Sequence, residues 1–434
     1  MKAKSIGAGV AVAAAVVLGG WVSAQQGQSP VGNVIFIHPD GQGPNGWAVA
    51  RLAIVGPDGE LNWDKLPHIA AYKGHMLDSV TASSNGGAIT HAYGVKVPRN
   101  NAGMLDGKPV VAANGQPRSL LLEAKRRGLS AGIVNSASIT DAGTGLFVAQ
   151  VPNRRDHTEI ARQIFDARPE VVLGGGEQWF LPRGVRGRHG EGQRPDGRNL
   201  IDEFRRAGYT VVYTRDELLR LPRNTIRLLG LFAADDTFND LGEEELKERG
   251  LEPYPAQAPT TAEMTEAALR VLENTGRRFL LVAEEEGSDN FAGENNASGT
   301  IEALRRADGM IGHALAFLRR NPNTLILTTA DSDCGGMQAK GLPIADAEKP
   351  LGPRSENGAP MDGRAGTGSP PFLAEADRNG RRWPFAVVWA DSSDLSGGNL
   401  IRASGLNASL VRGTADNTFV YEIMYRTLFG RSPR

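Results

Sequence analysis

Short runs of apolar residues recur along the chain, and each ends abruptly in glycine, proline or acidic residues. The clearest run, residues 34–37, is followed by Pro39, Asp40 and two glycines. A continuous apolar run of this length predicts a strand that is buried on both faces. Helical patterns alternate with the runs. The chain is therefore expected to form an α/β fold, with a mainly parallel central sheet and helices on both faces.

Other segments are assigned from the same patterns. Further strands are predicted at residues 131–135, 170–176, 210–213, 228–232, 278–283, 324–330 and 387–390. Helices are predicted at residues 47–54, 120–127, 157–165, 200–207, 260–274 and 299–319. Residues 235–259 are expected to be a surface excursion, and residues 335–379 an irregular segment near the site. No linker divides the chain, so residues 25–434 are expected to form a single catalytic domain.

Acidic residues follow several of the predicted strands. Parallel strands bring their carboxyl ends to one edge of a sheet, where ligands bind in open α/β folds. Each acid alone has an ordinary explanation as a helix cap or turn residue. Together, six carboxylates at one edge cannot all stay ionised without cations, so several bound metals are expected. The predicted metal ligands are Asp40, Asp141, Glu284, Asp289, Asp331 and Asp333.

The N-terminus indicates export. Lys2 and Lys4 precede an alanine-rich apolar stretch at residues 7–21, and Val22, Ser23 and Ala24 form a small-x-small cleavage pattern. These features predict a signal peptide at residues 1–24 and a periplasmic or secreted product. The stretch is short for a membrane span, so no membrane association is expected after cleavage.

Composition excludes other classes of protein. The formal charge of the 434-residue chain is −1, which gives no electrostatic basis for binding nucleic acid or a membrane surface. Cys334 is the only cysteine, so neither an intrachain disulfide nor a cysteine zinc cluster can form.

Around these acids the chain resembles the alkaline phosphatase family, over nearly all of its length after residue 24. Asp40-Gly-Gln-Gly resembles the first metal-binding motif of the family, and residues 141–154 match without a gap from a magnesium-site aspartate to the phosphate-binding Arg154. Residues 172–176, the spacing of Glu284 to Asp289, and Thr-Thr-Ala-Asp331 are similar too. The resemblance implies metal-dependent hydrolysis of small phosphate esters, with Arg154 binding the phosphoryl group.

The zinc-site histidines of the family are missing. Gly293 and Ser332 stand at two of their positions, and residues 391–394 occupy the region of the third. Asp333 and Asn290 are candidates for replacement oxygen donors. Oxygen donors favour hard cations, so the expected cofactors are divalent Mg and/or Ca, with Zn less supported.

The nucleophile is a serine at one of two neighbouring positions. Alignment on Val-Thr81 selects Ser83, and alignment on Gly-Val-Lys96 selects Ser84. We favour Ser84, because Asn85 and the two glycines after it offer backbone N–H groups to a phosphoryl oxygen. The expected catalytic residues are thus Ser84 and Arg154, with Arg154 and Asn85 binding substrate.

The expected function is that of an exported phosphate monoester hydrolase acting through a phosphoserine. A phosphodiesterase on the same scaffold and a non-catalytic phosphate- or metal-binding relative are the alternatives. A sulfatase is disfavoured, because no Cys/Ser-x-Pro-x-Arg motif is present. His38 and His91 are interpreted as packing or supporting residues, since a lone histidine carries little signal.

Overall fold

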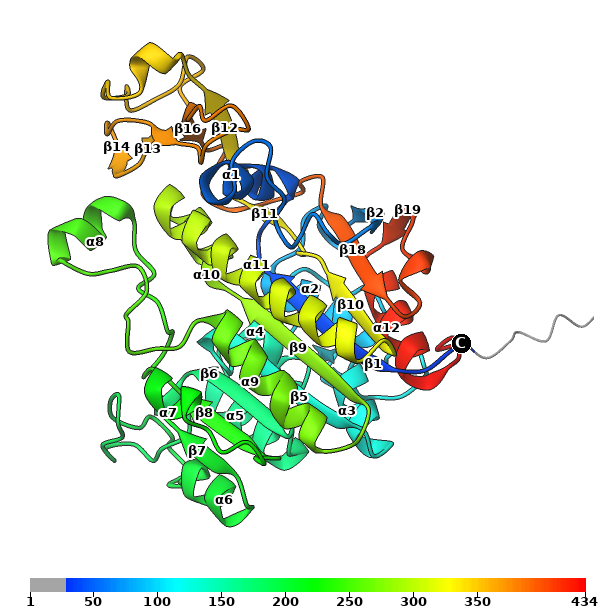
Figure 1. The fold of residues 1–434 in the computed structure, drawn as a ribbon. Helices are drawn as coiled ribbons and strands as arrows, with labels where there is room; N and C mark the ends of the chain where they lie inside the picture. Colours follow the sequence, from blue (N-terminus) through cyan, green and yellow to red (C-terminus); the bar gives the residue numbers. More distant parts are fainter. Residues whose placement is uncertain (1–28) are drawn as a thin grey trace, which may run out of the picture.

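A ten-stranded sheet forms the centre of the computed structural model, which describes residues 29–434 (Figure 1). The predicted signal peptide lies outside the described residues. The strands lie in the order β19 (Gly413–Asp416), β2 (His68–Lys73), β18 (Leu400–Gly405), β10 (Thr324–Thr328), β1 (Asn33–Pro39), β9 (Phe279–Glu285), β5 (Ser130–Ser138), β6 (Val171–Gly175), β8 (Leu228–Leu231) and β7 (Thr210–Val212). From β10 to β7 all neighbours pair in parallel, whereas β18 is antiparallel to both of its neighbours. The predicted mainly parallel α/β fold is confirmed.

Helices cover both faces of this sheet. One face packs against α2 (Ser84–Tyr93), α3 (Leu120–Arg126), α5 (His157–Ala167), α6 (Leu200–Arg206) and α12 (Phe419–Phe429). The other face packs against α1 (Pro44–Ile54), α7 (Arg215–Leu219), α9 (Thr261–Asn274) and α11 (Ala297–Arg320). Among the described residues, none of the helices combines the length and apolarity that a membrane crossing requires.

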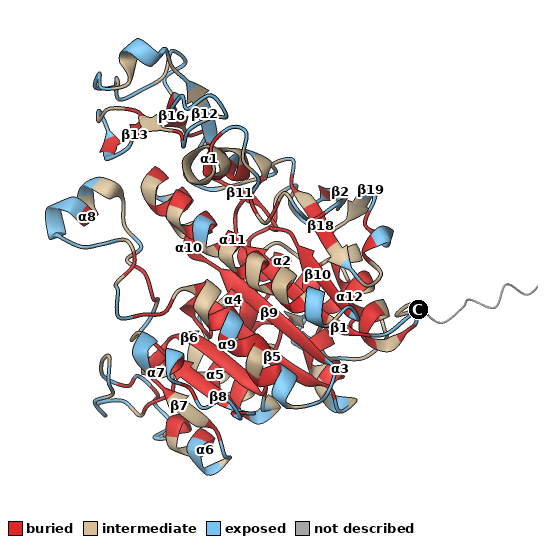
Figure 2. Ribbon diagram, in the orientation of Figure 1, coloured by how far each residue is buried: buried red, intermediate tan, exposed pale blue. Residues whose placement is uncertain are grey.

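The two-sided packing explains the continuous apolar runs. In β1, Val34 and Phe36 belong to the core on one face, while Ile35 and Ile37 belong to the core on the other. All four side chains are at most 1% exposed. Figure 2 shows the same burial along the neighbouring strands β9 and β5. A strand covered on both sides has no polar face, and the usual alternation is lost.

The strand predicted at residues 387–390 belongs to a different sheet, so that expectation was wrong. A small antiparallel sheet beside α1 contains β12 (Gln338–Gly341), β13 (Met361–Gly363), β14 (Gly366–Thr367), β15 (Phe372–Leu373) and β16 (Pro384–Val388). Trp389 and Phe385 pack with Val49 of α1 in a core of their own. Asp391 after this strand is exposed. Residues 335–379 are correspondingly less irregular than expected.

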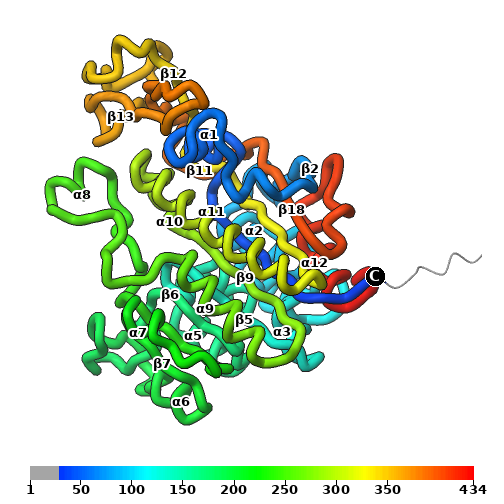
Figure 3. Tube along the Cα trace, viewed as in Figure 1, coloured from blue at the N-terminus to red at the C-terminus, as the bar shows by residue number. Residues whose placement is uncertain are grey.

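The excursion at residues 235–259 contains a helix that was not predicted, α8 (Glu243–Arg249), which projects from the body of the molecule (Figure 3). Its first turn holds three glutamates, and Lys247 and Arg249 lie in its last turn. This charge order complements the helix dipole. Leu246 anchors the segment in a small core with Tyr254 and Phe291.

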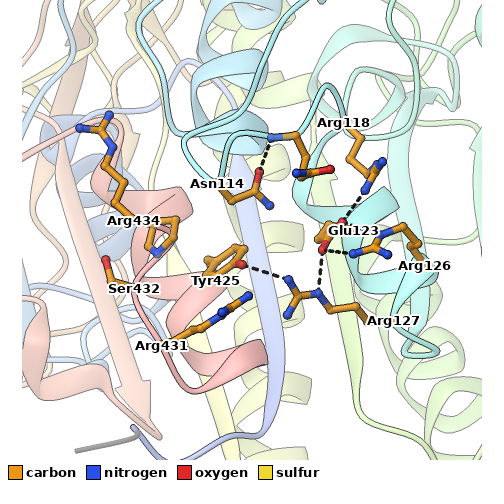
Figure 4. Close-up of a pocket in the computed structure, with 11 residues that line it drawn as sticks. Asn114, Arg118, Glu123, Arg126, Arg127, Tyr425, Arg431, Ser432 and Arg434 are labelled. Atoms are coloured by element: carbon orange, nitrogen blue, oxygen red, sulfur yellow. Dashed lines mark hydrogen bonds and ion pairs between the residues drawn. The ribbon is translucent and has the colours of Figure 1, made fainter. Parts of the chain in front are cut away.

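An arginine-rich cavity of about 620 Å³ lies between α3 and α12 (Figure 4). The helix α3 ends just before β5 begins, and Gly32, just before β1, donates a backbone hydrogen bond to Thr427 of α12. The cavity therefore lies at the amino edge of the sheet, opposite the edge where the acids gather. Its lining residues include Arg118, Glu123, Arg126, Arg127, Arg431 and Arg434.

Glu123 in this cavity provides a test of the packing between α3 and its surroundings. The side chain is 1% exposed and accepts hydrogen bonds from Arg118, Arg126 and Arg127. Burial opposes ionisation, but the three arginines outweigh it and lower the pKa of Glu123 from 4.5 to about 2. A depressed carboxyl pKa stabilises the fold above pH 4.5, and the stabilisation is lost as the pH falls toward 2.

We therefore expect Glu123→Gln to lower the free energy of unfolding by about 1–3 kcal/mol at pH 7. The difference from the wild type should shrink when urea unfolding is repeated near pH 3. Glu266→Gln, at an exposed position, is the matched control and should change little. Equal stability of Glu123→Gln and the wild type at pH 7 would contradict the assignment.

Candidate active site

Four adjacent strands bring the predicted acids together. β10, β1, β9 and β5 are neighbours in the sheet and run in parallel. Asp331 and Asp40 follow β10 and β1, Glu284 lies near the end of β9, and Asp141 follows β5. Their carboxylates therefore lie at one edge, as expected for a ligand site in an open α/β sheet.

The turn after β1 places Asp40 at the centre of this edge. The backbone N–H of Asp40 donates to the carbonyl of Glu285 (3.2 Å), and the N–H of Gly41 donates to Oδ1 of Asp40 (2.8 Å). Gly41 has a φ of +64°, and a Cβ there would lie 2.2 Å from Oδ1 of Asp289. Only glycine permits both the backbone conformation and the close approach of Asp289.

Three groups of side chains have donor atoms close enough to share a cation. Within each group, one donor atom from each residue lies within 4.8 Å of the others. Four of the six predicted ligands belong to these groups. The groups are His38, Asp40 and Asp331; Asp289, Cys334 and Asp394; and Asp40, Glu284 and Glu286.

Several acid oxygens in these groups are buried without a hydrogen-bond partner among the described residues. They are Oδ2 of Asp40, Oδ1 of Asp289, both oxygens of Asp331 and Oε2 of Glu286. Unpartnered buried oxygens are costly. Burial, followed by the charge of Asp40, raises the pKa of Asp289 and Asp331 well above the usual range. Divalent cations would remove both penalties, so the residues present fit such cations.

Two predicted ligands already have protein partners. Nη2 of Arg154 donates to both oxygens of Asp141, at 2.8 and 3.1 Å. Glu284 interacts with Nδ1 of His38 (2.9 Å) and accepts a hydrogen bond from Asn135 (2.6 Å). Burial raises the pKa of Glu284 to about 7. Asp141 thus lies outside the three groups and Glu284 within one of them, but the oxygens of both acids are engaged by protein partners.

Asp333 and Asn290 are placed outside the three groups. Asp333 accepts a hydrogen bond from the backbone N–H of Gly43 (3.1 Å) and so supports the turn that holds Asp40. The side chain of Asn290 donates to Asp240 (3.0 Å). Asp394 joins a group in their place.

Sequence reasoning missed Glu286, Cys334 and Asp394, and it assigned His38 to packing. Glu286 lies in the acidic run after β9, so its signal was present. Asp394 arrives through the antiparallel pairing of β17 (Asp394–Leu395) with β11 (Asp333–Cys334). No apolar run leads into that aspartate, so its only signal in the sequence was the family resemblance, which put residues 391–394 in the region of a missing histidine.

The two candidate serines differ in what their hydroxyls contact. Oγ of Ser83 donates to the carbonyl of Arg99 (2.8 Å) and to Oδ1 of Asn85 (2.9 Å). Ser84 is buried at the start of α2 and lies close enough to Asp40 to influence its ionisation. Burial opposes ionisation of Asp40, but His38, Asp331 and Ser84 together lower its pKa. Ser84 therefore lies near the acids, whereas the hydroxyl of Ser83 is held by neighbouring loop residues.

The start of α2 lies directly against Asp331. A Cβ on Gly87 would lie 2.0 Å from Oδ2 of Asp331, so the helix approaches this closely only because residue 87 is glycine. The N–H of Gly87 already donates to the carbonyl of Ser83 (2.8 Å), which removes it from the expected phosphoryl donors. The Asn85 side chain is turned toward Ser83.

Arg154 supplies positive charge at the same edge. The charge of Asp141 raises the pKa of Arg154, burial opposes this, and Glu286 and Asp40 raise it further. The guanidinium therefore stays charged and lies within electrostatic reach of the acids. A cation next to buried carboxylates and a serine hydroxyl is suited to binding and transferring a phosphoryl group.

Comparison with known proteins identifies one family. A family model described as Alkaline phosphatase matches residues 31–358. Alkaline phosphatase of Gadus morhua is 28% identical over 336 residues, which cover 69% of this chain and 68% of that protein. Streptomycin-6-phosphate phosphatase of Streptomyces griseus is 28% identical over 347 residues, covering 71% and 74%.

Solved structures agree on the fold. Thermus thermophilus alkaline phosphatase superposes with a TM-score of 0.71 at 24% identity, covering 96% of each chain. The alkaline phosphatase of the Antarctic bacterium TAB5 gives 0.69 at 19% identity, covering 93% of this chain and 100% of that one. A variant of the TAB5 enzyme has Mg bound in its M3 site. At these identities the similarity establishes the fold alone.

The unpartnered acids predict that cation binding stabilises the fold. Excess divalent cation should raise the free energy of unfolding by about 2.7 kcal/mol at a hundredfold excess over Kd, relative to the chelated protein. Thermal unfolding with a chelator, and then with Mg²⁺, Ca²⁺ or Zn²⁺ added back, measures the effect. An identical Tm of the wild type in chelator and in excess of each cation would refute it.

Two variants locate this effect. Asp331→Asn removes one of the crowded charges, so it should be at least as stable as the wild type in chelator and should gain less from cations. Asp391→Asn, at an exposed position outside the three groups, should gain as much as the wild type.

Proposed function

Because the chain belongs to the alkaline phosphatase family, we propose that it hydrolyses small phosphate monoesters through a covalent phosphoserine on Ser84. Family membership makes the protein a phosphoric ester hydrolase of a divalent-metal-dependent family. The observation that carries the proposal is the position of Ser84 at the start of α2, where Gly87 of the same helix lies against the unpartnered oxygens of Asp331, near Asp40 and Arg154.

Arg154 binds and orients the phosphoryl group. Both of its hydrogen bonds to Asp141 come from Nη2, so that pair does not use the hydrogens on Nε and Nη1. An Nη1 hydrogen donates to a phosphoryl oxygen, and the guanidinium charge holds the phosphorus in front of Ser84. The fixed orientation favours attack in line with the leaving group.

Ser84 provides the nucleophile. Its hydroxyl loses a proton as Oγ attacks phosphorus, the Oγ–P bond forms, and the bond from phosphorus to the ester oxygen breaks. The alcohol leaves and takes up a proton. Water then attacks the same phosphorus, and inorganic phosphate and the free Ser84 hydroxyl are released.

The cations belong with Asp40, Asp289 and Asp331, whose oxygens lack partners, and with Glu286 and Asp394 close by. When bound, divalent cations lower the pKa of a nearby hydroxyl and stabilise charge on the phosphoryl and leaving oxygens. Asp141 contributes through its hydrogen bonds to Arg154, and Glu284 contributes through its contact with His38. Either acid binds a cation only after it releases that protein partner. Mg and Ca remain the proposed ions for sites built from oxygen alone.

Hydrolysis takes place outside the cytoplasm in this proposal. The support is the leader pattern of residues 1–24, with its lysines, apolar stretch and small-residue cleavage pattern. Small phosphate esters in the periplasm or the medium are then the substrates.

Replacing Ser84 tests the nucleophile. Ser84→Ala should lower kcat/KM for an aryl phosphate by roughly a thousandfold or more, because no covalent intermediate forms. Metal content, measured by elemental analysis, should be retained. Acid-quenched wild type should carry phosphate on the peptide that contains Ser84, as detected by mass spectrometry.

Ser83→Ala is the matched control, since it removes the neighbouring hydroxyl and should keep turnover. Loss of turnover in Ser83→Ala, with full activity in Ser84→Ala, would move the nucleophile to Ser83.

The choice of ester separates the proposal from a phosphodiesterase. A monoester presents more charged oxygens to Arg154 and to the cations than a diester does. We therefore expect kcat/KM for an aryl phosphate monoester to exceed that for the corresponding diester by at least about tenfold, or 1.4 kcal/mol in transition-state stabilisation. A faster diester reaction with the same leaving group would favour the alternative.

A further inference from the structure

We propose that Nε2 of His38 joins Asp40 and Asp331 as a ligand, which makes this a mixed nitrogen and oxygen site for a divalent transition metal. The inference rests on the proposed function, since it concerns the cation site beside Ser84. His38 follows the apolar run of β1 and lies two residues before Asp40. One donor atom of each of the three residues lies within 4.8 Å of the other two.

The two nitrogens of His38 have different surroundings. Nδ1 lies 2.9 Å from Oε1 of Glu284. Nε2 is buried without a hydrogen-bond partner among the described residues and lies 3.7 Å from Oδ1 of Asp40. When Nδ1–H donates to Glu284, Nε2 is left with a free lone pair directed at the acids. A carboxylate on one nitrogen with the other free is how proteins orient metal-binding imidazoles.

The spacing fits a shared metal. Donors bound at about 2.0–2.2 Å in tetrahedral geometry lie roughly 3.4 Å apart. The distance of 3.7 Å from Nε2 of His38 to Oδ1 of Asp40 is close to this value. Asp331 has two unpartnered oxygens, and Asp40 has one, so the site does not lack oxygen donors.

A purely supporting role for His38 accounts for only half of these contacts. Orienting Glu284 explains Nδ1, but it leaves Nε2 buried without a hydrogen bond, 3.7 Å from Oδ1 of Asp40. His91 is the informative comparison, because its ring lies 5.7 Å from that of His38. One nitrogen of His91 is hydrogen-bonded to the hydroxyl of Tyr72 (2.8 Å) and the other is unpartnered, as in His38, but His91 belongs to none of the three groups.

An imidazole ligand changes which metals the site prefers. Carboxylates alone favour Mg, Ca and Mn, whereas an imidazole with carboxylates also suits Zn, Co and other transition metals. The family histidines that are absent from the sequence would thus be replaced, in part, from a different strand. The oxygen-only expectation then applies to the group of Asp40, Glu284 and Glu286 and not to this one.

Pulsed electron paramagnetic resonance on Mn²⁺-saturated full-length protein tests the ligand directly. Modulation from a histidine nitrogen is expected in the wild type, and it should change when the histidines are labelled with ¹⁵N. The signal should persist in His91→Gln and disappear in His38→Gln. Mn²⁺ affinity, followed by titration, should fall by at least about tenfold in His38→Gln.

The wild-type spectrum decides the matter even if His38→Gln folds poorly. A saturated wild type without histidine-nitrogen modulation overturns the inference, as does unchanged modulation in a folded His38→Gln protein. The proposed function fails separately, because its test is phosphate on the Ser84 peptide. Nitrogen coupling without phosphoserine would reject the mechanism and keep the ligand, and phosphoserine without nitrogen coupling would do the reverse.

Discussion

Mutual repulsion among buried carboxylates is the constraint on which this molecule depends. Asp40, Asp289 and Asp331 have oxygens that no described protein donor reaches, and burial together with the charge of Asp40 raises the pKa of Asp289 and Asp331. Such an arrangement is costly for the fold alone. The arrangement becomes favourable when multivalent cations bind the oxygens. The unfavourable free energy of the unpartnered carboxylates at the sheet edge is therefore the reason that this edge binds metals and supports phosphoryl chemistry.

The sheet concentrates these charges by topology. Consecutive strands in space, β10, β1, β9 and β5, come from distant parts of the chain, and their parallel pairing aligns the ends. Gly41 and Gly87 then let backbone approach Asp289 and Asp331 more closely than any side chain would permit. The order of the strands sets which acids meet, and the glycines set how closely they are crowded.

The alternation of apolar runs and helices was enough to predict the central sheet, because a strand covered on both faces is apolar throughout, as in β1. It could not predict which sheet a strand joins, and β16 carries the same local pattern while pairing elsewhere. Among the site residues, Asp40 and Asp331 were visible as acids after strands. Asp394 was not, because it arrives through antiparallel pairing from a segment with no pattern of its own.

The ion pair of Arg154 with Asp141 has a consequence for the cost of recognition. Arginine side chains usually give up considerable rotamer freedom when they engage a ligand. Here Nη2 is already fixed by two hydrogen bonds to Asp141, at 2.8 and 3.1 Å, and the ion pair does not use the hydrogens on Nε and Nη1. Most of the ordering of the Arg154 side chain has therefore taken place during folding. A phosphate group then binds a guanidinium that is already in position. The conformational entropy of the Arg154 side chain is therefore lost on folding, where it lowers the stability of the protein, and it does not weaken the affinity for substrate.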